Sequence, residues 1–399
     1  MRRRSRRRNK AGVPKEPGLE QTRFVMSVAF LTAPSVPPAE AFPELTRLPP
    51  DRRPEVLVAR TASVKTWLPI LDTLADKRIA LSQEEREARD PLVAVWLATP
   101  QENPEPLAVV ADLLLLGGGW PLLRAVLAEL EASRGSPRAE RLERLARLSG
   151  VYVPSLYALR YAADGSVASV IPRPGVPWPR GLEGATPFDE GDEAPPPGHP
   201  APEIQHLLGR ISSPEEVAGQ VQEGERIFLS FAVGLPAASA ASIAQWVKKL
   251  RHCLVVRLRD ERRLPPLSVG LTCFVPRPWT PLQWWPMPGG RALKDQLSST
   301  LRALRAVPGV TVTHDLPKWA MLEGVLALGD RRAGDFLLAT RRLGWDRACV
   351  EHPLNPAFFL NRRKRAEEIL PWDHVDWGQD RARLRARYES ALAAVGVEP

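Results

Sequence analysis

Residues Leu107–Leu116 form an apolar run that ends at three consecutive glycines, Gly117, Gly118 and Gly119. A run of this kind predicts a strand that is buried on both faces of a sheet. Helical periodicity follows over residues 121–133, with a proline near the first turn, where proline is tolerated. Strand, glycine turn and helix together make one βα unit, which favours a doubly wound parallel sheet.

Neighbouring segments extend this unit into a first domain. Residues 56–60 and 92–97 predict short buried strands, and residues 67–75 have the apolar spacing of a helix. A charged helix is expected over 137–148. Residues 152–170 predict a hairpin that turns at Asp164-Gly165.

A second domain is expected after a proline-rich segment, residues 172–202, that holds an acidic cluster at 189–193. Beyond it strands are expected over 226–233, 254–258, 268–274 and 310–313, and helices over 242–250, 292–306 and 316–328. Strands that alternate with helices favour βαβ units and a parallel sheet. From Trp345 the chain is expected to be irregular, apart from a charged closing helix over 380–395.

The positive charge is concentrated at the N-terminus. The formal net charge is +9, and residues 1–10 contribute +7 of it, leaving +2 for the remainder. A segment this basic, without apolar residues to bury, is expected to be disordered. Contact with RNA or DNA phosphates, contact with anionic lipid heads, and a purely solubilising role are all open for it. The candidate nucleic-acid contacts are Arg2, Arg3, Arg4, Arg6, Arg7 and Arg8.

Cysteine usage and hydropathy point to a cytoplasmic protein. Cys253, Cys273 and Cys349 are too few and too widely spaced for a disulfide framework or a zinc knuckle, and buried inert thiols are the expectation. The basic N-terminus does not lead into the apolar core of a signal peptide. The most apolar stretch, residues 113–123, is too short to span a bilayer, so no membrane association is expected.

Several segments, taken in order, resemble the uncharacterised radical S-adenosylmethionine (SAM) proteins that carry a cobalamin-binding-like N-terminal domain. The matching residues are 90–93 (DPLV), 103–108 (NPEPLA), 150–157 (GVYVPSLY), 234–236 (GLP), 274–281 (FVPRPWTP), 283–284 (QW), 322–327 (LEGVLA), 329–332 (GDRR) and 370–376 (LPWDHVD). The resemblance implies a β/α barrel after the first domain. Because residues 172–225 are too few to supply its early strands, the barrel is expected to be truncated.

The predicted fold is therefore α/β, with a small doubly wound parallel-sheet domain, a truncated β/α barrel and an irregular C-terminal extension. Its parts are a disordered basic tail (1–20), a cobalamin-binding-like domain with its hairpin connector (21–171), a proline-rich acidic linker (172–225), the partial barrel (226–344) and the extension (345–399).

The resemblance also implies cofactors that this sequence is not equipped to hold. The family binds a four-iron cluster through Cys-x-x-x-Cys-x-x-Cys, and one open iron then binds SAM. No cysteine precedes Cys253 here, so loss of both the iron–sulfur cluster and SAM is expected. Cobalamin binding is doubtful because Asp-x-His-x-x-Gly, the cobalt-ligating motif of many such domains, is absent. No cofactor and no metal site are predicted.

The glycine turn and one polar constellation are candidate sites. Gly117, Gly118 and Gly119 could let a phosphate approach helix amides, or could be a packing turn. Asp373, His374 and Asp376 could bind a metal or move protons, although a hydrogen-bonded structural loop is the simpler interpretation.

Further candidates lie near the ends of later elements. His314, beside Asp315 after a strand, stands where barrel sites lie. Glu323 with residues 330–332 is expected to form an ion-pair network that holds the C-terminal region onto the barrel. Trp279, Trp284 and Trp285, with Arg277 and Arg291 nearby, suit either packing of an extended segment or a stacking platform for single-stranded nucleic acid.

These observations favour a catalytically degenerate radical SAM homologue that acts as a non-enzymatic accessory or regulatory protein. A truncated barrel leaves strand edges exposed, so a protein partner is expected to cover them. A full-length family member is one candidate for that partner. One alternative is a residual enzyme or small-molecule binder, which would have His314 or His374 in a closed pocket with other polar groups. The other is an RNA-associated protein that uses the arginine-rich tail.

Overall fold

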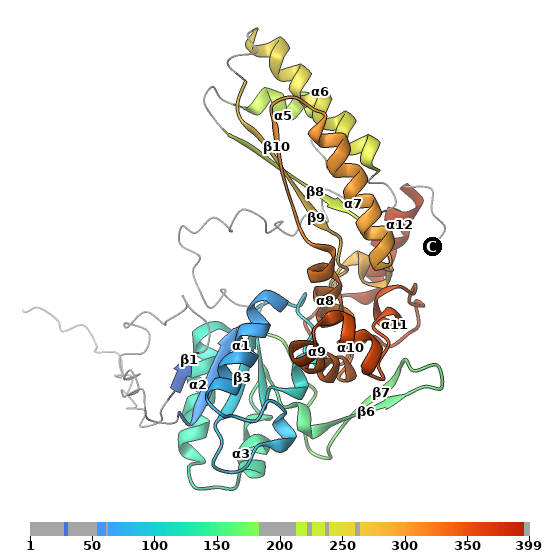
Figure 1. Ribbon diagram of the computed structural model, residues 1–399. Coiled ribbons are helices and arrows are strands. Elements are labelled where there is room, and N and C mark those ends of the chain that lie inside the picture. Colours follow the sequence, from blue (N-terminus) through green and yellow to red (C-terminus); the bar gives the residue numbers. More distant parts are fainter. Residues whose placement is uncertain are drawn as a thin grey trace, which may run out of the picture.

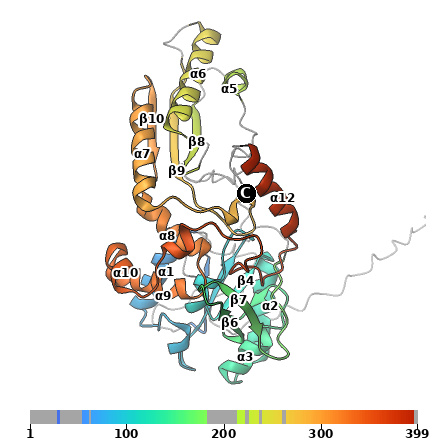
Figure 2. The same cartoon turned by 90° about the vertical axis from the view of Figure 1, so that its right-hand side faces the viewer.

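The computed structural model describes residues 28–30, 54–60, 63–182, 213–221, 226–235, 239–259 and 264–394. The expected basic tail (1–20) and much of the expected linker (172–225) lie outside these ranges. Two units are stacked into an elongated molecule: an N-terminal sheet with its helices, and a smaller sheet that stands above it (Figure 1). The view turned by 90° shows the same separation, with the last helix beside the junction (Figure 2).

The N-terminal unit contains a five-stranded sheet. Its strands are β1 (Val28–Phe30), β2 (Val56–Arg60), β3 (Leu92–Leu97), β4 (Leu113–Leu116) and β5 (Val151–Tyr152). The first four are parallel, and β5 is antiparallel to β4. The α/β class is thus confirmed. The strands follow one another in consecutive order, so the described part of the sheet lacks the reversal of order that defines a doubly wound sheet.

The apolar run over 107–116 is not one strand, as the sequence pattern predicted. The 3-10 helix η2 (Glu105–Val109) takes its first half, and β4 begins only at Leu113. Pro106 favours the start of a helical turn, and Asp112 breaks the run. The buried Asp112 carboxylate accepts hydrogen bonds from Val93 N and from the guanidinium of Arg86, at 2.8 and 2.7 Å.

Helices of the first unit follow the sequence prediction closely. They are α1 (Val64–Asp76), α2 (Gly119–Ala132) and α3 (Arg138–Leu145). The predicted hairpin is also present, as β6 (Tyr157–Tyr161) and β7 (Val167–Pro172), and Asp164 Oδ1 accepts from Ser166 N in its turn. It begins later than expected, because residues 151–152 join the first sheet as β5 and the 3-10 helix η3 (Pro154–Leu156) follows.

The second unit is an open sheet of three parallel strands. β8 (Ile227–Val233), β9 (Leu267–Cys273) and β10 (Val310–His314) pair in the order β10-β9-β8. Three strands do not close, so the described residues form an open sheet here, and the expected truncated barrel stays a prediction. Helices α6 (Ala240–Leu258) and α7 (Gly290–Arg305) cover one face, and the short α5 (Pro214–Gln220) packs on α6.

Residues 254–258 were expected to form a strand, and this prediction is wrong. They form the last turns of α6, in which Val247, Leu250 and Leu254 lie on one buried face. No glycine or proline interrupts the segment, so the helix continues to Arg259, which caps it in the left-handed conformation. Short apolar runs of this kind do not distinguish strand from helix by periodicity alone.

Helices dominate the rest of the chain. They are α8 (Pro317–Leu328), α9 (Arg332–Leu343), α10 (Trp345–Glu351), α11 (Ala357–Leu360) and α12 (Arg381–Ala394). The extension is therefore only partly irregular: two short helices precede the loops, while the predicted closing helix is present. No helix in the part of the chain that the structure describes is long and apolar enough to cross a bilayer.

The two units meet where η2 packs against α8 and α9. The Asn103 side-chain amide donates to the carbonyls of Ala327, in the last turn of α8, and of Gly329, just after it, at 3.1 and 2.7 Å. Gly334, inside α9, lies directly against η2: a Cβ there would stand 2.5 Å from the carbonyl oxygen of Pro106. The contact is therefore close enough to require glycine.

Gly334→Ala should lower the free energy of unfolding by about 1–3 kcal/mol, since the added methyl group must push η2 away from α9. Alanine ordinarily stabilises a helix over glycine by about 1 kcal/mol, so the sign is opposite to helix propensity. Gly219→Ala in α5, where nothing lies within 4 Å of the added carbon, is the matched control and should be neutral or stabilising. Urea denaturation measures both, and a stabilising Gly334→Ala would contradict the close contact.

Candidate functional site at the junction of the two units

Asp373, His374 and Asp376 share one loop but have different partners. Asp373 accepts hydrogen bonds from Leu370 N, at 2.8 Å, and from the guanidinium of Arg381. Burial raises the pKa of Asp373, while Arg381 opposes that shift. Asp376 is exposed and accepts from Gly378 N at 2.8 Å. No group of three metal-ligating side chains occurs among the described residues, so the structural interpretation fits this loop.

His374 is turned away from these carboxylates into the interior. Its side chain is 2% exposed, and Nε2 lies 3.4 Å from Oε1 of Glu105 in the N-terminal unit. The imidazole packs against the Tyr152 ring, with centroids 5.1 Å apart. Burial lowers the pKa of His374, with Glu105 opposing that shift, so the ring is neutral near pH 7.

Glu105 is the centre of this buried cluster. Its carboxylate is fully buried and accepts from Tyr152 Oη at 2.5 Å and from Arg331 Nε at 3.1 Å. Arg331 also donates to Tyr152 Oη and to the Tyr157 carbonyl, both at 2.9 Å. Burial disfavours the Arg331 charge, but the Glu105 carboxylate outweighs this and holds the pKa of Arg331 above its usual value. Burial, together with Glu105, also raises the pKa of Tyr152.

The cluster joins distant parts of the chain. Glu105 and Tyr152 come from the N-terminal unit, whereas Arg331 precedes α9 and His374 lies in the C-terminal loop. Arg331 was expected to hold the C-terminal region onto the barrel, but it pairs with the N-terminal unit instead. Its neighbour Arg332 pairs with Asp330 at 2.6 Å and lies 4.0 Å above the Tyr161 ring, which fixes the hairpin. Glu105, Tyr152 and Arg331 satisfy one another, whereas neither ring nitrogen of His374 has a hydrogen-bond partner among the described residues. The cluster, which we call the joint, therefore holds together segments that are far apart in the sequence.

The glycine turn after β4 is filled by another part of the chain. Gly117, Gly118 and Gly119 all have positive φ, of 69°, 69° and 55°. Residue 182 pairs with Gly117, and a Cβ on Gly117 would stand 2.1 Å from the Leu182 carbonyl oxygen. Leu182 N donates to the Leu116 carbonyl at 2.9 Å, so the chain itself occupies the place above the turn. The turn therefore fits packing, because Leu182 stands where a phosphate would approach Gly117.

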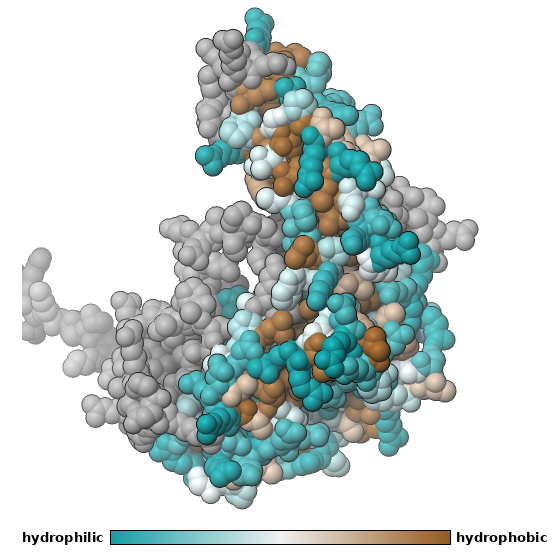
Figure 3. All heavy atoms as spheres, in the orientation of Figure 1, coloured by the Kyte–Doolittle hydropathy of each residue, from teal (hydrophilic) through white to brown (hydrophobic). Residues whose placement is uncertain are grey.

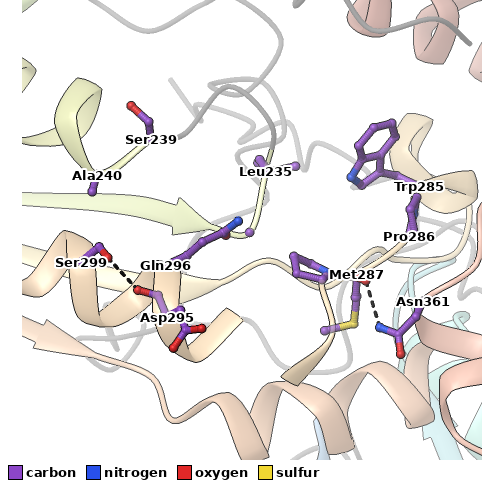
Figure 4. Close-up of a pocket in the computed structure, with 12 residues that line it drawn as sticks. Leu235, Ser239, Ala240, Trp285, Pro286, Met287, Asp295, Gln296, Ser299 and Asn361 are labelled. Atoms are coloured by element: carbon purple, nitrogen blue, oxygen red, sulfur yellow. Dashed lines mark hydrogen bonds between the residues drawn. The ribbon is translucent and has the colours of Figure 1, made fainter. Parts of the chain in front are cut away.

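His314 is exposed at the end of β10, where its Nδ1 lies 2.9 Å from the Asp315 carbonyl oxygen. Two clefts of the described surface measure about 590 and 270 Å³, and neither His314 nor His374 lines them. The larger one lies between the N-terminal ends of α6 and α7 and the loop at 285–288 (Figure 4). The closed histidine pocket expected of a residual enzyme is therefore not formed by these clefts.

A second acidic group lies where the carboxyl ends of β2 and β3 approach the second unit. Glu102, after β3, accepts from Thr99 N at 3.2 Å and experiences the charges of Arg60 and Arg277. Arg277 follows β9 and pairs with Glu323 of α8 at 2.9 Å. Burial raises the pKa of Glu102 to about 7, although the two arginines and the backbone amides lower it.

The thiols do not fit an iron–sulfur cluster. Cys253 lies within α6, Cys273 ends β9 and Cys349 lies in α10, and all three are free. Cluster ligation requires several thiolates converging on one site. Burial raises the pKa of the Cys273 thiol to about 12, which disfavours the thiolate that binds iron.

Residues 64–154 match the family model described as "Radical SAM proteins, N-terminal". This segment is related to the N-terminal domain of radical SAM proteins. No curated protein and no solved structure matches the chain. The matched radical SAM N-terminal domain runs from α1 into η3 and so contains Glu105 and Tyr152, two of the four groups at the joint.

The pairing at the joint was not foreseen from the sequence. Glu105, Tyr152 and Arg331 each stood in a segment that resembles the radical SAM family, within NPEPLA, GVYVPSLY and GDRR. A buried glutamate in an apolar segment needs a partner, which was an available signal. The sequence did not show which of the many arginines supplies it.

Arg331→Met should lower the free energy of unfolding by about 3–5 kcal/mol, because it leaves the buried Glu105 carboxylate without its cation. Arg347→Met removes an exposed ion pair with Glu351 and should change stability by less than about 1 kcal/mol. Thermal and urea unfolding of both variants provide the measurement. Equal, small losses in the two variants would show that Glu105 does not depend on Arg331.

Glu102 should make the folded state less stable as pH rises. Its folded-state pKa of about 7 lies above the ordinary value of 4.5, so between these values the folded protein holds a proton that the unfolded chain releases. Glu102→Gln should remove this slope and be more stable than wild type above about pH 7, by on the order of 2 kcal/mol. Glu87→Gln, at an exposed glutamate, is the control. A Glu102→Gln protein with the wild-type pH profile of urea denaturation would refute the buried-acid interpretation.

Proposed function

We propose that this protein is a catalytically degenerate radical SAM homologue that acts as a non-enzymatic accessory or regulatory protein. It binds a protein partner on the open face of its three-stranded sheet. The first candidate for that partner is a radical SAM protein that retains the three cluster cysteines.

The open face of the sheet carries this proposal. One face is apolar and packs on the helices, with Phe231 contacting Trp246 of α6 at a centroid distance of 5.6 Å. The opposite face, which a closed barrel would enclose, presents Phe228, Ser230, Thr311 and Thr313, all exposed. Phe228 is 50% exposed and lies over Gly270. An aromatic ring among small residues on an uncovered sheet suits a partner surface.

The strand edges support the same proposal. β8 and β10 each pair only with β9 among the described residues, which leaves one backbone edge of each strand without a neighbour. Free edges of this kind pair readily with strands from another chain. A partner that adds strands here would extend the sheet toward the barrel that the radical SAM family is known for.

The positions of the cysteines support the loss of radical SAM chemistry. The sequence has no cysteine before Cys253, and Cys273 is buried at a strand end. Without three converging thiolates, an iron site with an open position for SAM has no ligands.

A small-molecule binder remains the second candidate, and the 590 Å³ cleft favours it. A role for the arginine tail in binding RNA stays a prediction, since residues 1–10 lie outside the described ranges.

Affinity capture of the full-length protein from its host should recover a radical SAM protein that contains the three-cysteine motif. Phe228→Glu, which places a charge on the open face, should abolish that recovery, whereas Val350→Glu on α10 should not. Val350 is 84% exposed and is therefore a matched apolar control. Capture unaffected by Phe228→Glu, or a purified monomer with no partner, would refute the proposed docking face.

Anaerobic incubation of the same purified protein with iron and sulfide tests the lost chemistry separately. No charge-transfer absorption from an iron–sulfur cluster should appear. A reconstituted cluster that cleaves SAM reductively would overturn the non-enzymatic assignment, whatever the result of the capture experiment.

A further inference from the structure

Helices α6 and α7 carry a large excess of basic residues. Together they contain eight basic residues and one acidic residue; the basic ones are Lys248, Lys249, Arg251, Arg257, Arg291, Lys294, Arg302 and Arg305. In contrast, residues 54–182 contain equal numbers of both signs, fifteen of each. Ordinary protein surfaces intersperse the two signs. The second unit therefore carries a concentrated positive charge that is separate from the N-terminal tail.

These charges face away from the sheet. The buried faces of the two helices are apolar, including Ile243 and Val247 in α6 and Leu293 and Leu297 in α7. Lys248, Lys294 and Arg302 are exposed, and hydrophilic groups are visible along the α6–α7 side of the upper unit, with apolar residues between them (Figure 3). We call this outer surface of the two helices the basic face.

Local contacts explain only part of the charge on the basic face: Lys249 pairs with Glu215 of α5 at 2.7 Å, and Arg257 donates to the carbonyls of Ala218 and Val221. Lysine and arginine near a helix C-terminus complement the helix dipole, and Arg257, Arg302 and Arg305 do so. Arg291, however, stands in the first turn of α7, and Lys294 directly follows that turn; neither is offset by an acidic residue in the first turn. Positive charge there opposes the dipole and costs stability. Charges kept at such positions suit the binding of an anionic partner.

The 590 Å³ cleft lies at the lower end of the basic face. Trp285 forms one wall, and the Arg363 guanidinium lies 5.0 Å from the centroid of its ring. Gln296 and Ser299 of α7 line the opposite side (Figure 4). Trp284, by contrast, is fully buried in the core. Asp295 of α7 also lines the cleft, as its one acidic side chain. The cleft thus offers one aromatic surface together with amide, hydroxyl and carboxylate groups, which suit stacking and hydrogen bonding of an unpaired base.

We propose that the basic face binds the phosphate backbone of single-stranded RNA, with one unpaired base held against Trp285 in the cleft. A duplex would keep its bases stacked and out of reach of the tryptophan, whereas RNA-binding proteins commonly stack unpaired bases on aromatic rings. The binding surface lies on the helix side of the sheet. It is therefore independent of the open face in the proposed function, and a partner on that face would leave it accessible.

Fluorescence anisotropy of a labelled single-stranded RNA with the full-length protein tests the basic face. The variant Lys248→Glu/Lys294→Glu/Arg302→Glu should lose affinity by about ten-fold or more and show a smaller salt dependence. The matched control is Lys77→Glu/Arg147→Glu/Arg160→Glu in the N-terminal unit, which should stay within about two-fold. Both are repeated with Arg2, Arg3, Arg4, Arg6, Arg7 and Arg8 changed to Gln, so that the tail cannot mask the result.

Trp285→Ala tests the cleft. It should weaken binding of the RNA by about ten-fold but leave an abasic oligonucleotide of the same charge unaffected, and Trp285→Phe should restore most of the affinity. Equal loss in both charge-reversal triples, equal affinity for duplex RNA, or equal affinity for polyglutamate would overturn the proposal. So would a Trp285→Ala effect that is the same with and without bases.

Discussion

The buried ion pair between Glu105 and Arg331 is the contact on which the arrangement of the two units depends. The two residues are separated by 226 positions, and Glu105 is fully buried. A carboxylate removed from water is stable only when its charge is matched and its lone pairs are hydrogen bonded. Tyr152 and Arg331 meet that requirement here, and Asn103, two residues earlier, ties the same segment to the end of α8.

The candidate ligand sites of the sequence are occupied by other parts of the chain. Parallel sheets bind ligands beyond the carboxyl ends of their strands. In this protein Leu182 fills the space above Gly117, while Glu102 and Arg277 lie at the approach of the two units. His374, the most suggestive single residue in the sequence, completes the packing of the joint. At the carboxyl edge of the first sheet, the space is taken by Leu182 and by residues that approach the second unit.

The sequence predicted local features better than pairings. Strands 56–60, 92–97 and 310–313 and the turn at Asp164-Gly165 follow from patterns within a few residues, and the structure has them. The prediction of one strand over 107–116 was wrong because the buried Asp112 interrupts the apolar run. The strand predicted over 254–258 was wrong because its apolar residues continue the buried face of a helix. The match of Glu105 to Arg331 depends on tertiary structure, which no local pattern encodes.

The second unit contains a parallel sheet that is open in the described residues. Parallel strands usually need cover on both faces, and α6 and α7 cover only one. The sheet tolerates this because the alternation within β8 and β10 places apolar residues toward the helices and small or hydroxyl side chains on the other side. Phe228 is the exception on that open face, because it is the one large aromatic side chain among these small and hydroxyl side chains. Phe228 is 50% exposed, and contact with water is unfavourable for an aromatic ring. The binding partner that we propose would cover this ring.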